Sequence, residues 1–291
     1  MKNTIGLILN ILLISGLLSC EKYIDFDEDS TTSKIVLNAM IRPDTSFQVH
    51  LSRSLSVIDA GNLSSIANAI VAVYDDSGIL VETLIEDSMG YYNGSQLPEE
   101  NVNYRIVAEA LNYADVNATC AIPMPTVISE WDTLTITPFP NAAQNETELQ
   151  VSFEFTDEEQ INNFYMVTVS AVDTSSWGGV YPNPVYIGTT DPKFGSEYAD
   201  KSSDKLLFND LLFDGETTTF TITFSDMSYM SYLVLNLYSC SEEYYLYNKS
   251  YQTAIEAEGN PFAQPVQVYS NINNGHGIFG GFQVSSKIIN M

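Results

Sequence analysis

Hydrophobic and polar residues alternate along most of the chain beyond Lys34. Alternation with a period of two is typical of a strand that is buried on one face. Asp75–Gly78 is typical of a hairpin turn, because glycine supplies the positive φ that tight hairpins need. The pattern predicts strands at residues 35–41, 47–51, 69–74, 79–85, 90–92, 104–110 and 116–122. Strands separated by turns at this short spacing indicate an antiparallel β-sandwich, so residues 34–123 form the first predicted domain.

Pro123 and Pro125 interrupt this pattern and mark a domain boundary. Beyond it, residues 124–291 form the second predicted domain, a sandwich of the fibronectin-III or immunoglobulin kind. Leu149–Phe155 alternates most clearly, with its apolar side chains on one face. Further strands are predicted at 133–137, 164–172, 217–224, 232–238 and 283–289. The predicted fold class is therefore mainly β, with two antiparallel β-sandwich modules in succession.

One helix is predicted, over residues 241–257. Ser241 is a suitable N-cap, and Glu242 and Glu243 lie where the helix dipole favours negative charge. Tyrosines recur at helical spacing, and Gly259 follows the last turn. A stripe of this kind is more typical of packing against a sheet than of ligand binding.

Residues 173–204 show no periodicity, and a loop of roughly thirty residues is far longer than the usual connection of about 4–6. Long loops in compact domains are commonly functional, and the aromatic residues here argue against disorder. These residues are Trp177, Tyr181, Tyr186, Phe194 and Tyr198. The sequence favours two interpretations equally: the aromatic side chains contact a partner protein, or the loop folds back over an open face of the sheet.

The first residues resemble the signal peptide of a bacterial lipoprotein. Lys2 precedes an apolar run from Ile5 to Leu18, which is shorter than the roughly 20 residues of a membrane span. The run ends in Leu-Leu-Ser-Cys, which resembles a lipobox with Cys20 as the lipidated residue. We therefore expect residues 1–19 to be removed. Cys20 would then carry diacylglycerol and an N-acyl chain such as palmitate, and these chains would anchor the protein to the outer membrane.

Residues 20–33 are predicted to form an acidic tether. Glu21 replaces the aspartate that retains many lipoproteins at the inner membrane, and residues 25–29 are acidic. The segment resembles the export signals of lipoproteins on the surface of Bacteroidota, so we expect display on the cell surface. The alternative is a solvated spacer that only keeps the domains away from the membrane.

The charge of the chain excludes one class of partner. The sequence has 11 Lys+Arg against 37 Asp+Glu, a formal net charge of -26. Binding to nucleic acid depends on a basic face that releases counterions from the phosphates. We therefore expect no nucleic-acid partner.

Residues with candidate catalytic chemistry are few. His50 and His276 have no recognisable catalytic context and are expected to be structural. Cys120 and Cys240 lie in different predicted domains and are expected to be buried free thiols, with a disulfide between them as the alternative in an oxidising compartment. No zinc, phosphate-loop, dinucleotide or EF-hand motif appears, so no metal and no cofactor beyond the lipid is predicted. Pairs of carboxylates occur by chance in so acidic a chain and do not indicate a glycosidase.

Part of the first domain resembles a known module. The matching segments are Ala67–Val73, Asp76–Gly78, Gly90–Tyr92, Tyr104–Ala108 and Asn112–Tyr113. They resemble the transthyretin-like or carboxypeptidase-regulatory sandwich. The resemblance implies a binding or spacer module without catalytic residues of its own.

A wider resemblance covers the whole mature chain. Asn260–Phe282, with its sequence NPF, SNI and GIFGGF, the segment Asn209–Gly215 and the lipobox resemble the Bacteroidota family catalogued as domain of unknown function 4249. The resemblance implies an outer-membrane lipoprotein, often encoded beside a TonB-dependent, SusC-like β-barrel receptor, and it supplies no catalytic residues. The expected function is that of a non-enzymatic accessory subunit of such a transporter in nutrient capture or uptake. The alternatives are a structural or assembly subunit of a larger outer-membrane complex, and a surface hydrolase that acts through carboxylates.

Overall fold

The computed structural model describes residues 33–55, 64–136, 147–174, 180–198, 201–225, 230–260 and 262–290. The predictions for the signal peptide 1–19, for Cys20 and for Trp177 lie outside these residues, as does most of the tether 20–33. The side chain of Tyr181 is also outside the description.

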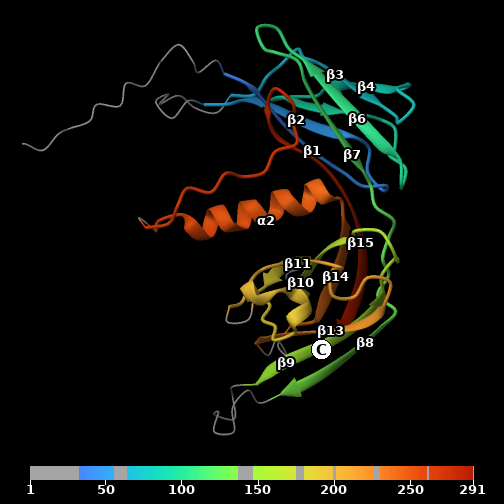
Figure 1. Ribbon diagram of the computed structural model, residues 1–291, viewed down its shortest axis with the longest axis vertical. Coiled ribbons are helices and arrows are strands. Elements are labelled where there is room, and N and C mark those ends of the chain that lie inside the picture. Colours follow the sequence, from blue (N-terminus) through green and yellow to red (C-terminus); the bar gives the residue numbers. More distant parts are fainter. Residues whose placement is uncertain are drawn as a thin grey trace, which may run out of the picture. The chain divides into compact units, whose positions relative to one another are not determined.

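The described chain is mainly β, as predicted, and its first strands follow the alternating pattern closely (Figure 1). They are β1 (Ile35–Ile41), β2 (Gln48–Arg53), β3 (Ile70–Tyr74), β4 (Leu80–Glu86), β5 (Tyr91–Asn93), β6 (Asn103–Glu109) and β7 (Val116–Ala121). Their inward residues are fully buried, for example Leu37, Val49 and Ile106. The turn between β3 and β4 has Gly78 at φ 77°, the conformation for which glycine was expected there.

The remaining elements begin after Pro125. They are β8 (Glu130–Ile136), β9 (Glu148–Thr156), β10 (Phe164–Thr174), β11 (Val180–Val185), the 3-10 helices η2 (Pro192–Phe194) and η3 (Ser196–Tyr198), β12 (Leu206–Asn209), β13 (Thr217–Ser225), β14 (Tyr232–Cys240), α2 (Glu242–Ala257) and β15 (His276–Asn290). The predicted helix is confirmed, and the Ser241 side chain accepts a hydrogen bond from Tyr244 N as its N-cap. The segment 173–204 is not a loop without structure, because β11 pairs with β10 within it.

Strand pairing joins both halves of the chain. The larger sheet has the order β11-β10-β14-β15-β1-β2-β5-β4-β3-β6-β7, with β12 also paired to β10. The smaller sheet has the order β13-β9-β8. Most of the pairs are antiparallel, and β1 with β15 is a parallel one. The sandwich-like arrangement therefore contains one sheet that runs through the two predicted domains.

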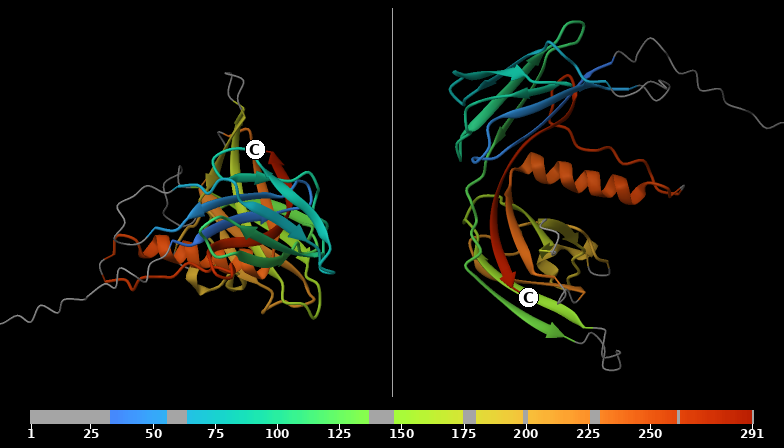
Figure 2. Two further views of the ribbon diagram at one scale, coloured as in Figure 1. Left: turned by 90° about the horizontal axis from the view of Figure 1, so that it is seen from above. Right: turned by 180° about the vertical axis from the view of Figure 1, so that it is seen from behind.

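The last strand is longer than the sequence pattern predicts, and it has two partners. It begins at His276, not at Gln283, and residues up to Gly281 pair in parallel with β1. From Phe282 onward it pairs with β14 instead. Figure 2 shows this strand, in dark red, running from the blue β1 and β2 toward the orange β14. The start of the strand was not predicted because its glycines break the alternating pattern. These glycines are needed for close packing: a Cβ on Gly281 would lie 2.6 Å from the backbone oxygen of Ala121, so only glycine fits there.

Two large hydrophobic cores result. The first consists of side chains from 35–122 together with Ile272 and Phe279 from the C-terminal part of the chain. The second consists of side chains from Ile128 to Ile289 and contains a cluster of phenylalanines. A smaller cluster, with Met166, Leu207 and Tyr245, lies where α2 packs on the outer face of the larger sheet. The expected packing of the tyrosine stripe is confirmed only near the start of the helix, at Tyr244, because Tyr251 and Ile255 of the same stripe are exposed and Tyr245, outside the stripe, is buried.

Candidate functional site

The aromatic residues of segment 173–204 separate into buried and exposed side chains. Phe194 and Tyr198 are only 1% and 3% exposed, so the prediction that they contact a partner is wrong. Both belong to the second core, because η2 and η3 fold this part of the segment back over the sheet. Tyr186 is 67% exposed, so its side chain is accessible to a partner. The interpretation of a loop that covers a sheet face therefore holds for the C-terminal part of the segment.

Ring packing and a hydrogen bond fix the buried part of the segment. The ring of Phe194 lies 4.8 Å from that of Phe208 and 5.4 Å from that of Phe220. The hydroxyl of Tyr198 accepts a hydrogen bond from Leu207 N at 3.1 Å. Burial raises the pKa of Tyr198 to about 12, so the hydroxyl stays protonated at neutral pH.

An open groove of about 250 Å³ lies beside these residues, and we call it the leucine groove. It is formed by η2, by β12 with the turn that follows it, and by one face of α2. Its lining residues are Pro192, Lys193, Phe194, Gly195, Glu197, Leu207, Phe208, Asn209, Leu211, Leu212, Tyr245 and Lys249. Three features noted separately in the sequence meet here: the segment 173–204, the family motif Asn209–Gly215 and the tyrosine helix.

The turn after β12 holds two leucines in solvent. Phe213 is buried in the second core, and its backbone N–H donates to Asp210 O at 2.7 Å. Leu211 and Leu212, immediately before it, are 81% and 65% exposed. An anchored turn that presents adjacent large apolar side chains to water is a feature of interaction sites more than of ordinary surfaces. The motif Asn-Asp-Leu-Leu-Phe-Asp-Gly shows three adjacent apolar residues but does not say which of them faces the core.

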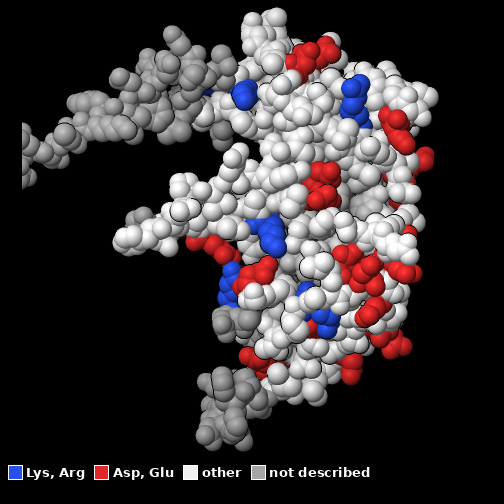
Figure 3. Space-filling view, in the orientation of Figure 1, with Lys and Arg blue, Asp and Glu red and all other residues white. Residues whose placement is uncertain are grey.

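Two lysines border the leucine groove, in a chain with few basic residues. Lys193 Nζ lies 2.9 Å from Asp191 Oδ1 and 5.2 Å from the centre of the Phe220 ring. Lys249 Nζ donates to the Tyr245 hydroxyl at 3.1 Å. Figure 3 shows acidic side chains scattered over the face in view, with few lysines or arginines among them. Lys249 Nζ also lies 3.3 Å from Glu197 Oε1, so the leucine groove has two lysine–carboxylate pairs at its edge.

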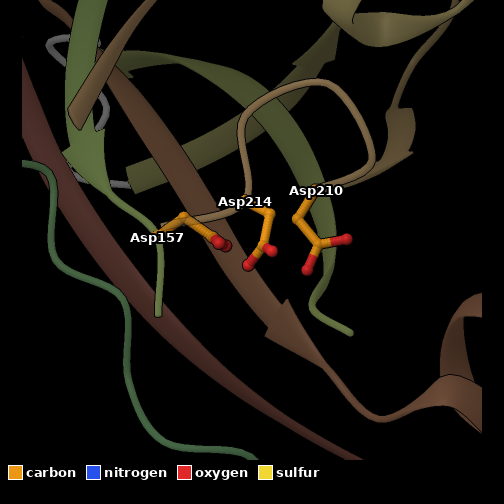
Figure 4. Close-up of side chains that lie close together, drawn as sticks. All are labelled: Asp157, Asp210 and Asp214. Carbon is orange, nitrogen blue, oxygen red and sulfur yellow. The ribbon is translucent and has the colours of Figure 1, made fainter. Parts of the chain in front are cut away.

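Three carboxylates converge behind the exposed leucines. Asp157, Asp210 and Asp214 have oxygens that all lie within 4.8 Å of one another, which is close enough to hold a metal ion. Figure 4 shows Asp157 coming from the segment after β9, and Asp210 and Asp214 coming from the turn after β12. Sequence reasoning missed this group because Asp157 is far from the other two in the chain, outside the spacing of any calcium loop.

Hydrogen bonds already occupy each of these carboxylates. Asp157 accepts from the Tyr165 hydroxyl at 2.5 Å and from Gly215 N at 2.9 Å. Asp210 accepts from Asn163 N at 2.6 Å, and Asp214 accepts from Gln160 N at 3.0 Å. The three aspartates thus tie the turn after β9 to the turn that presents the leucines.

The close charges affect the acidity of one carboxyl. Burial, together with the charges of Asp157 and Asp214, raises the pKa of Asp210, although the hydrogen bond from Asn163 N opposes the shift. The hydrogen bonds of the cluster suit a structural tie between the two turns, and the spacing of its oxygens also suits a cation site.

The histidines and cysteines occupy ordinary structural positions. The ring of His50 packs 4.6 Å from that of Tyr91, and His276 is exposed at the start of β15. Cys120 and Cys240 are free and buried, as expected. Burial raises the pKa of both thiols well above the usual value, so neither is a ready nucleophile. Within the described residues, no helix is long and apolar enough to cross a membrane.

Comparison with solved structures finds distant likenesses. A crystal structure of a mutant Salmonella alpha-2-macroglobulin aligns with 10% identity and a TM-score of 0.26, over 88% of this chain and 15% of that one. The present chain thus spans a small part of that protein's length. The B domain of a biofilm-associated protein aligns with 7% identity and a TM-score of 0.22, over 93% of this chain and 89% of that one. Scores this low support no argument about fold or function.

Comparison by sequence is more informative. Among curated proteins, none matches this chain. A family model described as "Domain of unknown function (DUF4249)" matches residues 21–288, which include the turn of the leucine groove and the C-terminal strand. The chain therefore belongs to the DUF4249 family.

Proposed function

We propose that this protein is a non-enzymatic, lipid-anchored protein of the outer membrane, displayed on the cell surface. In this proposal it is an accessory subunit of a TonB-dependent, SusC-like β-barrel transporter and serves nutrient capture or uptake. The leucine groove is the surface that contacts an extracellular segment of the barrel. The observation that carries the proposal is the anchored turn with Leu211 and Leu212 exposed beside an apolar groove.

The sequence at the N-terminus supports the anchor. The apolar run and the Leu-Leu-Ser-Cys sequence together have the form of a lipoprotein signal. The family match begins at residue 21, directly after Cys20, so the family domain coincides with the expected mature chain. Two or three acyl chains on Cys20 would hold the protein at the membrane, because each buried methylene contributes about 0.8 kcal/mol.

The leucine groove supports protein docking. Burying one leucine side chain contributes roughly 1.5–3 kcal/mol, so two adjacent leucines supply enough energy for a central contact of an interface. Lys193 is paired with Asp191 and Lys249 with Glu197, so the edge of the groove favours an apolar partner segment over a charged one. Tyr186 is exposed but does not line the leucine groove, so it is a separate candidate contact.

The acidic cluster favours a structural role over hydrolysis. Asp157, Asp210 and Asp214 each accept a backbone N–H, and Asp157 also accepts the Tyr165 hydroxyl. Carboxylates held in this way suit a fixed turn better than proton transfer to a substrate, because general acid–base catalysis needs a group free to approach the reacting atom.

Affinity purification of the lipidated protein from its own outer membrane tests the proposal. The parent should retain a TonB-dependent barrel, and the double variant Leu211→Ser, Leu212→Ser should retain at least tenfold less. The matched control is Leu111→Ser, which changes an equally exposed leucine in the turn between β6 and β7. Capture of a different outer-membrane complex would favour the structural or assembly role, and equal capture by parent and double variant would remove the groove from the interface.

The anchor has its own test. Replacement of Cys20 by serine should abolish metabolic labelling with palmitate and should release the protein from the membrane fraction. Protease added to intact cells should degrade the parent if the protein is displayed at the surface. Protection of the parent until the outer membrane is opened would place it on the periplasmic side.

A further inference from the structure

A second hollow lies away from the leucine groove, beside the point where β15 changes partner from β1 to β14. It is an open cleft of about 500 Å³, within the usual size range of small-molecule sites, roughly 300–1,000 Å³. Its lining residues are Arg42, Pro43, Asp44, Asn236, Tyr238, Phe282, Gln283, Val284 and Ser286. We call it the polar cleft.

Its floor is the outer face of β14 and β15. Asn236 lies opposite Ser286, and Tyr238 lies opposite Val284, so these four side chains point the same way. The Ser286 hydroxyl donates to Asn236 Oδ1 at 2.7 Å, and Asn236 Nδ2 donates to Thr168 Oγ1 at 3.3 Å. The polar groups of the floor are therefore held in one orientation before any ligand arrives.

Two aromatic rings border the floor. The rings of Tyr238 and Phe282 are 5.7 Å apart, and Phe282 also packs 4.9 Å from Tyr244 of α2. Gln283, between Phe282 and Val284 in β15, points its side chain to the other face of the sheet, where its Nε2 donates to Pro123 O at 2.8 Å. Rigid rings beside oriented polar groups are what a binding site for a small ligand requires.

The wall of the polar cleft is the turn between β1 and β2. Arg42 Nε and Nη2 both donate to the carboxylate of Asp44, and both side chains remain accessible to solvent. This pair supplies the only formal charges among the lining residues, and the two charges cancel. A guanidinium has five N–H donors, so Arg42 can still donate to a ligand after it has paired with Asp44.

We propose that the polar cleft binds a neutral, polyhydroxylated ligand of the saccharide class. Planar amide, carboxylate and guanidinium groups can each form two hydrogen bonds to neighbouring hydroxyls, and the ring of Tyr238 offers a flat face to the C–H groups of a sugar ring. An anionic ligand is disfavoured by the strongly acidic chain, and a cation finds Asp44 already paired. This site is separate from the leucine groove and does not depend on docking to a barrel.

Isothermal titration calorimetry of the purified lipidated protein tests the inference. The detergent must be zwitterionic and free of sugar, so that it does not occupy the site. The probes are maltotetraose, cellotetraose, xylotetraose and mannotetraose. At least one should bind saturably, and Tyr238→Ala and Asn236→Ala should each weaken that binding at least tenfold. Tyr251→Ala is the control and should leave it unchanged, because Tyr251 is exposed on α2 and lies outside the polar cleft.

Three results would overturn the inference. They are the absence of binding by all four probes at millimolar concentration, unchanged binding in both cleft variants, or tighter binding of a uronic-acid oligosaccharide than of its neutral counterpart. Thermal unfolding of each variant shows whether it is folded, so that a loss of saccharide binding is not mistaken for a loss of structure. Should Tyr238→Ala fail to fold, Tyr238→Phe keeps the ring, and the double variant Arg42→Met, Asp44→Asn then tests the wall of the cleft.

Discussion

The side chain of Asn271 holds both backbone groups of Phe279. Its Nδ2 donates to Phe279 O at 2.8 Å, and its Oδ1 accepts from Phe279 N at 2.9 Å. Phe279 is fully buried in the first core, on the part of β15 that pairs with β1. One asparagine thus fixes the position at which the C-terminal strand enters a core built mainly by the N-terminal part of the chain.

Replacement of Asn271 by alanine should therefore destabilise the whole described fold. Loss of the partner for two backbone groups costs about 1–3 kcal/mol when they are left unsatisfied. Urea unfolding followed by circular dichroism measures the change in the free energy of unfolding. Gln267→Ala, an exposed change in the same segment, should have little effect. Equal stability of both variants would show that the contact is replaceable by water.

Ser241 links three elements and should tolerate only a residue that keeps its hydroxyl. Its Oγ accepts from Tyr244 N at 3.2 Å as the helix cap, from Gly281 N at 3.2 Å and from the Cys120 thiol at 3.4 Å. Ser241→Ala should lower the free energy of unfolding by about 1–2 kcal/mol, the usual cost of a lost N-cap. Ser241→Thr should recover most of this in the same urea titration. A loss as large with threonine would point to packing and not to hydrogen bonding.

Asp210 should make the protein less stable as the pH rises. Its folded pKa is raised above the unfolded value, so between the two values the native state binds more protons than the unfolded state. Stability then falls as pH rises through this window, and the loss persists at neutral pH. Asp210→Asn keeps an oxygen acceptor for Asn163 N and removes the charge.

The measurement is the melting temperature of parent and Asp210→Asn in the presence of EDTA. The variant should melt higher than the parent at pH 7, and the difference should shrink toward zero as the pH falls to the ordinary pKa of aspartate, about 3.9. Asp76→Asn, which removes one negative charge at an exposed position elsewhere, controls for a general effect of net charge. A variant less stable than the parent at pH 7 would contradict the inference that burial and the charges of Asp157 and Asp214 disfavour the ionised Asp210 carboxylate.

Both described thiols should be inert in the folded protein. Cys120 and Cys240 are buried, and burial raises the pKa of each thiol, which suppresses the reactive thiolate. Ellman's reagent should therefore give no signal at pH 8 without denaturant and should detect both thiols in guanidinium. Rapid reaction of either one in the native protein would mean that the strands around it open readily.

Local pattern was sufficient for most elements but not for their contacts. Leu149–Phe155 alternates so regularly that its strand and its buried face follow from the sequence alone. The same holds for Ser241 and the helix that it caps. Phe194 and Tyr198 gave no such signal, since an aromatic residue in an aperiodic segment looks the same whether a partner or the protein's own core covers it. Leu211 and Leu212 gave an ambiguous signal, because only the burial of Phe213 shows that they face solvent.

The sequence by itself determined the mainly β character, the helix, the two buried thiols and the membership of the DUF4249 family. These depend on periodicity, on capping and on motifs, all of which are properties of neighbouring residues. Only the tertiary structure decided that β15 completes the first core, that three aspartates converge, and that the leucine groove and the polar cleft exist. Each of these brings together residues far apart in the chain. The free energy of such contacts comes from packing and pairing between segments, which no local pattern records.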